Sequence, residues 1–107
     1  MLKRENRLSR IVRIAGERKY FSYLFQIRVS ESKDSQAKFG FVVSKKIDKR
    51  AVVRNRTKRV LRDAAGKFLD ILGGKNIVVV AKKSLSSKEK EEVIKEFKNI
   101  FKVETKS

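Results

Sequence analysis

Residues 44–62 combine many cationic side chains with a regular hydrophobic pattern, and this combination is suited to binding phosphates. The segment reads SKKIDKRAVVRNRTKRVLR and holds nine Lys or Arg side chains against one acid, Asp48. Guanidinium and ammonium groups donate charge-assisted hydrogen bonds to phosphate oxygens. A merely solvated helix surface normally alternates its charges or spaces them more widely. The excess of cations therefore predicts contact with a nucleic acid.

An α-helix would separate these cations from a packed face. At about 100° per residue, one stripe that would face a core contains Val53, Thr57, Val60, Leu61 and Ala64. A separate arc of about 140° holds side chains that all carry hydrogen-bond donors: Arg54, Asn55, Lys58, Arg59 and Arg62. We predict a helix that begins near Asp48, a possible N-cap, and continues to the Gly73-Gly74 pair. Such a helix would lie on a folded domain and present its donors to phosphates.

The overall composition supports a polyanionic partner. The chain has 107 residues, enough for one domain with a modest core, and a net charge of +17. Residues 1–62 hold 19 Lys or Arg and 5 Asp or Glu, whereas residues 63–107 hold 10 and 7. Affinity for a polyanion through such a cationic half should fall steeply as salt rises.

The remaining segments predict an α+β fold. In chain order, we expect a short helix at 9–16, strands at 19–29 and 38–45, the central helix, a strand at 76–82 and a last helix with a capping box, Ser86 to Glu89. In the first strand, Phe21, Tyr23, Phe25, Ile27 and Val29 would face the core, and the short polar connection at 31–36 suggests that the first two strands pair antiparallel. The order α-β-β-α-β-α predicts a two-layer sandwich on a small sheet.

Residues able to perform catalysis are scarce. The chain has no His and no Cys, which removes the usual general base and the usual zinc ligands. The densest acidic group, Glu89, Glu91 and Glu92, opens the last helix, where acids complement the helix dipole, so we expect no metal site and no catalytic residue. No segment has the length of a membrane span or the pattern of a signal peptide, which favours a cytoplasmic protein without a membrane partner. A DNA-binding helix-turn-helix is disfavoured because a strand precedes the basic helix.

Two motifs lie at the centre of the chain, Gly40-Phe-Val-Val-Ser-Lys-Lys46 and Ala51-Val-Val-Arg-Asn-Arg-Thr-Lys-Arg59, the second followed by Arg62. Together with the early Asn6-Arg7-Leu8, they resemble the signature of the bacterial ribonuclease P protein component. The resemblance covers nearly the whole chain, 1–107, as a single domain. It implies an α/β sandwich in which the central helix joins two parallel, neighbouring strands by a left-handed crossover, although general rules favour the right-handed form.

The resemblance also implies a function and a set of site residues. The protein would be the subunit of ribonuclease P that binds the catalytic RNA and the 5′ leader of precursor tRNA, while the RNA holds Mg²⁺ and cleaves the leader; the protein alone would be inactive. The implied RNA-binding residues are Lys45, Lys46, Arg50, Arg54, Asn55, Arg56, Lys58, Arg59 and Arg62. A ribosomal-type RNA-binding protein is the alternative, because it would share the charge and the fold class.

The N-terminal region departs from the family pattern. Family members usually carry two Phe residues one helical turn apart in the first helix, where this chain has Ile11, Val12 and Ala15. We therefore expect the leader to be held more by charge than by stacking. The residues expected to line the leader cleft are Tyr20, Leu24, Gln26, Arg28, Lys38 and Ser44.

Overall fold

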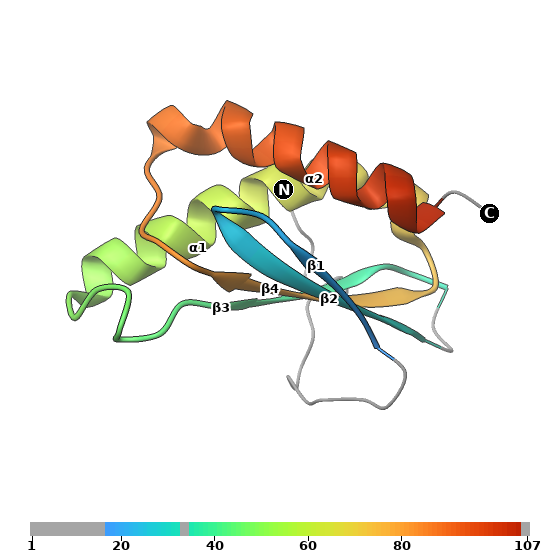
Figure 1. The fold of residues 1–107 in the computed structure, drawn as a ribbon, viewed down its shortest axis with the longest axis horizontal. Coiled ribbons are helices and arrows are strands. Elements are labelled where there is room, and N and C mark those ends of the chain that lie inside the picture. Colours follow the sequence, from blue (N-terminus) through green and yellow to red (C-terminus); the bar gives the residue numbers. More distant parts are fainter. Residues whose placement is uncertain (1–16, 33–34, 106–107) are drawn as a thin grey trace.

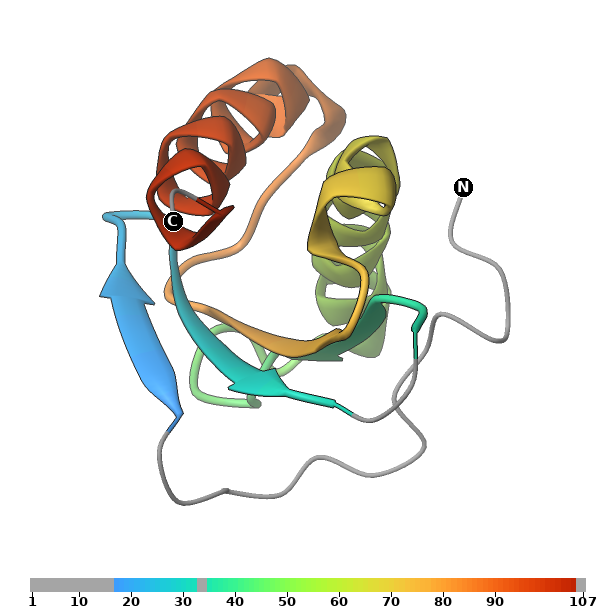
Figure 2. The ribbon, with the colours of Figure 1, turned by 90° about the vertical axis from the view of Figure 1, so that its right-hand side faces the viewer.

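The computed structural model describes residues 17–32 and 35–105, and within them four strands form one sheet (Figure 1). The strands are β1 (Arg18–Phe21), β2 (Phe25–Glu31), β3 (Lys38–Val42) and β4 (Lys75–Ala81). The helices are α1 (Ala51–Ala65) and α2 (Lys90–Thr105), with 3-10 turns at Gly66–Phe68, Asp70–Leu72 and Ser87–Glu89. Both α-helices cover the same face of the sheet (Figures 1 and 2), which confirms the α+β class. The helix predicted at 9–16 lies outside the described residues.

The strand order is β1-β2-β4-β3. β2 pairs antiparallel with β4, and β3 pairs parallel with β4. The expected direct pairing of the first two sequence strands is therefore wrong, because β4 lies between β2 and β3. β4 carries the β-branched run, with Ile77 and Val79 fully buried, and a central position buries such a strand best. The parallel β3–α1–β4 unit implied by the resemblance is present.

The segment predicted as one strand at 19–29 is in fact a hairpin of β1 and β2. The chain reverses at Ser22–Leu24, where the Ser22 amide donates to the Phe25 carbonyl (2.9 Å) and the Ser22 hydroxyl accepts from the Leu24 amide (3.1 Å). The break changes which side chains are buried. Leu24 is in the core, whereas Phe21 and Tyr23 are 66% and 59% exposed, so their predicted core position is wrong.

The core lies between the sheet and the two helices, and within its aliphatic side chains a group of Phe rings is in mutual contact. The Phe97 ring from α2 lies 4.7 Å from Phe25 of β2 and 5.3 Å from Phe101, centroid to centroid. Phe101 in turn contacts Phe68 (5.3 Å) and Phe39 of β3 (6.3 Å). These tilted and edge-on contacts fix α2 across β2 and β3.

The observed ends of the helices agree only in part with those predicted from the sequence. The capping box before α2 is present, because the Glu89 carboxylate accepts from the Ser86 amide (3.0 Å). The α1 helix ends at Ala65 and continues only as 3-10 turns, earlier than the predicted end at Gly73-Gly74. A Cβ at Gly73 would come 2.8 Å from the Ser35 carbonyl oxygen, so this turn needs glycine for close packing. The predicted N-cap is also wrong: Arg50 is the N-cap residue and makes no side-chain cap.

Candidate nucleic-acid interface

The two faces of α1 are those that the sequence predicted. All five residues of the expected core stripe are buried: Val53, Thr57, Val60, Leu61 and Ala64. The one polar member, Thr57, has its hydroxyl satisfied, because it donates to the Val53 carbonyl (3.0 Å) and accepts from the Leu85 amide (3.0 Å). Through this second bond, Thr57 joins α1 to the loop that leads into α2. The helix that carries the cations is therefore rigidly attached to the core.

The other face of α1 presents unneutralised cations. Asn55, Arg56 and Arg59 are exposed, and Lys58 and Arg62 are half-buried. Within residues 17–32 and 35–105, the side chains of Arg56, Lys58 and Arg59 form no ion pair. Their donors are therefore available to an external anion, and a row of such donors on one rigid helix suits the spaced phosphates of a nucleic acid.

Arg54 is held differently from the other arginines. Its Nη1 donates to the backbone carbonyls of Asp48 (3.1 Å) and Lys49 (2.7 Å). The side chain therefore ties the first turn of α1 to the loop before it. Sequence periodicity placed Arg54 in the cationic arc but gave no indication of this internal contact, because the loop conformation is not a helical property.

The same loop is held by a second interaction. The Asp48 carboxylate accepts from the Arg50 backbone amide (2.9 Å) and from its guanidinium through Nε (3.1 Å) and Nη2 (3.0 Å). These hydrogen bonds hold the pKa of Asp48 to about 2, well below its usual value. Arg50 thus has an internal partner, unlike Arg56 and Arg59.

The strand-end residues lie directly before this loop. Ser44, Lys45 and Lys46 are exposed, and the chain turns there, with the Ile47 amide donating to the Ser44 carbonyl (3.0 Å). Ile47 packs against the hydrophobic core. The structure therefore brings the two lysines to the N-terminal end of α1, so that the loop and the helix can act as one cationic surface.

The residues expected in the leader cleft divide between the two faces of the sheet. Register places Gln26, Arg28 and Lys38 on the face turned away from α1 and α2, beside β4. Tyr20 pairs with Ile27 on the helix side, and Leu24 is fully buried in the core. In the continuous strand predicted at 19–29, Tyr20, Leu24, Gln26 and Arg28 would share one face. That expectation is wrong, because the turn at Ser22–Leu24 breaks the alternation. Leu24 cannot contact a ligand from this position.

Tyr20 belongs to an ion-pair network at the end of α2. Its hydroxyl donates to Glu104, which also accepts from Arg18 Nε (2.9 Å) and lies 3.3 Å from Lys75 Nζ. Burial alone would raise the pKa of the Glu104 carboxyl, but hydrogen bonds from these three donors outweigh it and lower the pKa to about 2. Only 2% of the Glu104 side chain is exposed. Tyr20 thus connects β1 to α2 and has a structural role.

Phe21 is one of two aromatic residues, with Tyr23, that were predicted in the core and are exposed. It pairs with Gln26 on the face turned away from the helices, and Lys82 Nζ lies 5.4 Å from the centre of its ring. An exposed ring beside a cation is a platform on which a nucleotide base can stack. The signal that could have identified it is Ser22, a residue type that favours tight turns and that here interrupts the strand.

The described residues contain no group of three or more side chains of the His, Cys, Asp or Glu type that could hold a metal ion. No helix among them is long and apolar enough to cross a membrane. The exposed surface offers hydrogen-bond donors and positive charge on α1, and the exposed rings of Phe21 and Tyr23 at the hairpin of β1 and β2.

Comparison with known proteins relates this surface to one family. The family model described as Ribonuclease P matches residues 1–104. A ribonuclease P protein component from Marinomonas sp. is 39% identical over 71 residues, which is 66% of this chain and 54% of that protein. One from Xanthomonas oryzae is 51% identical over 49 residues, covering 46% of this chain and 34% of its own length. The chain thus spans about a third to a half of the curated relatives it matches.

Solved structures show the same fold. The RNase P protein from Staphylococcus aureus aligns with a TM-score of 0.68 at 22% identity, over 81% of this chain and 80% of that one. The RNase P protein from Thermotoga maritima aligns with a TM-score of 0.65 at 22% identity, over 81% and 83%. At this identity the likeness concerns the fold.

Proposed function

Because the chain belongs to the ribonuclease P family, we propose that it is the protein subunit of a ribonuclease P ribonucleoprotein. In this role, residues 1–107 act as one domain in the cytoplasm, bind the ribonuclease P RNA and help remove the 5′ leader of precursor tRNA. The observation that carries the proposal is the outward face of α1, where Arg56 and Arg59 are exposed and unpaired within the described part of the chain. The Arg54-Asn55-Arg56 motif lies on this helix.

The RNA subunit contacts α1 and the loop before it. Arg56, Lys58, Arg59 and Arg62 supply donors from the helix, and Lys45 and Lys46 extend the surface toward β3. Arg50 and Arg54 contribute mainly by holding the loop, because their guanidinium groups already bond Asp48 and the backbone. Contacts to phosphates would position the RNA without selecting a base sequence.

The leader lies on the face of the sheet turned away from α1 and α2. Arg28 supports this location, because its contact with Glu17 is long, at 4.0 Å from Nε to Oε1, and its Nε has no hydrogen-bond partner. Its positive charge is therefore only weakly neutralised. Phe21 supplies an exposed ring at the edge of the same face, with Lys82 beside it. A flexible single strand needs both charge and a stacking platform.

Phosphodiester cleavage belongs to the RNA in this proposal. The RNA would hold Mg²⁺, which would supply an activated water and stabilisation of the leaving oxygen. Among the described residues, no group of three or more His, Cys, Asp or Glu side chains could hold the metal. Protein free of RNA should therefore cleave no precursor tRNA in the presence of Mg²⁺. Specific 5′ cleavage by RNA-free protein would contradict the proposal.

Depletion in cells tests the proposal against a ribosomal-type RNA-binding role. RNA blots of tRNA precursors should show 5′-extended species accumulating soon after the protein is lost. Complementation with wild type should restore mature 5′ ends, whereas a variant with Arg56, Lys58 and Arg59 replaced by Ala should not. Normal 5′ ends together with a defect in ribosomal particles would favour the alternative.

A further inference from the structure

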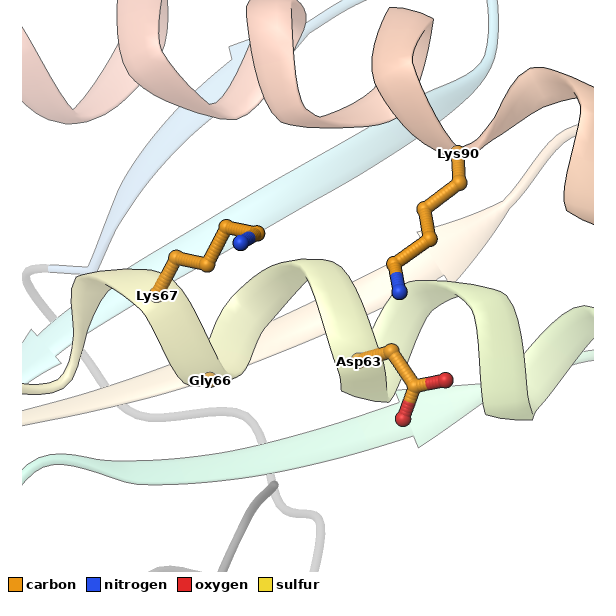
Figure 3. A pocket seen from close by; sticks show the side chains of 4 residues that line it. All are labelled: Asp63, Gly66, Lys67 and Lys90. Carbon is orange, nitrogen blue, oxygen red and sulfur yellow. The ribbon is translucent and has the colours of Figure 1, made fainter.

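A groove runs between α1 and the segment that opens α2. One part, of about 380 Å³, is lined by Arg56, Arg59, Val60, Asp63, Ser86, Ser87 and Lys90. A second part, of about 350 Å³, shares Asp63 and Lys90 and adds Gly66 and Lys67. Figure 3 shows Lys90 extending from α2 toward α1, with Asp63 projecting from α1 and Lys67 from the 3-10 turn that follows it. The two parts adjoin at Asp63 and Lys90, and we call them together the α1–α2 groove.

The α1–α2 groove has the charge expected of a phosphate site, with one exception. Arg56 and Arg59 line it from α1, Lys67 from the 3-10 turn after α1, and Lys90 from α2. Asp63 lies among them, four residues from both Arg59 and Lys67, a spacing at which helix ion pairs form. Within the described residues, however, Asp63 forms neither an ion pair nor a hydrogen bond. Its two carboxylate oxygens are therefore free to accept hydrogen bonds from a ligand.

An anionic group weakens phosphate binding, so Asp63 indicates a ligand that offers more than a phosphate. We propose that the α1–α2 groove binds one unpaired guanine nucleotide of RNA, a step that rests on the proposed RNA partner. The cations hold its phosphate, and Asp63 accepts from two neighbouring donors, N1–H and the N2 amino group of guanine. Adenine and uracil do not present two adjacent donors on this edge, and cytosine presents only its amino group. Reading unpaired bases by this edge is a general mode of RNA recognition.

The groove has the dimensions and surfaces for this ligand. Its volume is in the range of small-molecule sites, roughly 300–1,000 Å³. Val60 adds apolar surface, and the Ser87 hydroxyl adds a donor on the α2 side. Because Arg56 and Arg59 belong both to this groove and to the outward face of α1, a nucleotide here would continue the RNA path from α1 toward α2.

Titration of the full chain with GMP, AMP, CMP and UMP, followed by amide NMR shifts, tests the proposal. GMP should shift the amides of Asp63, Gly66, Ser87 and Lys90, with a Kd at least about fivefold below that of AMP, as one bidentate contact provides. Asp63→Asn removes the acceptor pair and the negative charge together. We therefore expect weaker GMP binding and unchanged or tighter AMP binding, so that the ratio of the Kd for AMP to the Kd for GMP falls to about one.

Two controls make the result decisive. Lys90→Gln should weaken all four nucleotides alike, and Lys102→Ala, near the far end of α2, should change none of them; the NMR spectrum of each variant reports whether it is folded. The proposal is overturned if wild type shows no preference for GMP, or if Asp63→Asn tightens all nucleotides and keeps the preference. If the ribonuclease P RNA still binds in that case, only the guanine site fails; loss of RNA binding by the wild-type protein would contradict the proposed function itself.

Discussion

Replacing Arg54 and Arg56 in parallel tests whether two arginines of one motif have different roles. Arg54 Nη1 bonds two backbone carbonyls, at 3.1 and 2.7 Å, whereas Arg56 is exposed. Hydrogen bonds from a charged donor contribute roughly 1.5–3 kcal/mol in favourable settings, and Arg54 is partly solvated, so we expect Arg54→Ala to cost about 2 kcal/mol. For a domain of this size, that loss lowers Tm by roughly 8–16 °C. Arg56→Ala should stay within about 0.5 kcal/mol of wild type.

Lysine variants separate charge from geometry in the same pair. Lys retains the positive charge, but its side chain is one bond shorter, so its ammonium does not reach the position from which Arg54 Nη1 donates to both carbonyls. Arg54→Lys should therefore be less stable than wild type in urea titrations. Its affinity for RNA should depend on salt in nearly the same way as that of wild type. Arg56→Lys should be neutral in both measurements. Arg56→Ala and Arg59→Ala should each reduce the slope of log Kd against log salt by about 0.7–0.9.

The outcomes that contradict these roles are specific. Wild-type stability of Arg54→Lys would show that the loop does not depend on the two hydrogen bonds from Arg54 Nη1. An unchanged salt slope in a triple Ala variant of Arg54, Arg56 and Arg59 would place the RNA site on another surface.

Three further predictions concern the core, the ion-pair network and the leader. The fold lowers the pKa of Glu104, so its contribution to the free energy of unfolding is present above the ordinary pKa near 4.5 and is lost as pH falls toward about 2. In urea titrations, Glu104→Gln should therefore cost about 3 kcal/mol at pH 7 and much less at pH 2.5. The exposed control Glu92→Gln should not show this difference between the two pH values. Thr57→Val should cost roughly 1–3 kcal/mol in the same assay, because the Leu85 amide loses its buried partner, and should leave the salt slope of RNA binding unchanged. Phe21→Ala should weaken precursor tRNA binding by roughly 1–3 kcal/mol relative to mature tRNA with little dependence on salt, whereas Tyr20→Phe should not; equal losses would refute the stacking role of Phe21.

Local patterns in the sequence determined the cationic helix and its attachment. The period of Val53, Thr57, Val60 and Leu61 predicted the buried face of α1, and the Ser86–Glu89 spacing predicted the cap before α2. These features depend on residues within one or two turns of each other, so the chain encodes them without reference to distant parts. The family signature lies on the same local elements, which is why the RNA-binding role could be expected from residues 40–62.

Only the tertiary structure decided the strand order and the surroundings of individual side chains. β4 separates β2 from β3, although the sequence connects those two strands by a short loop. The turn at Ser22 exposes Phe21 and turns Tyr20 toward Glu104, and the loop before α1 occupies Arg54. Strand pairing and loop packing depend on contacts between residues far apart in the chain, and a single break in alternation reverses every later side chain. The physical reason is that periodicity specifies a face, whereas the partner of that face depends on the whole fold.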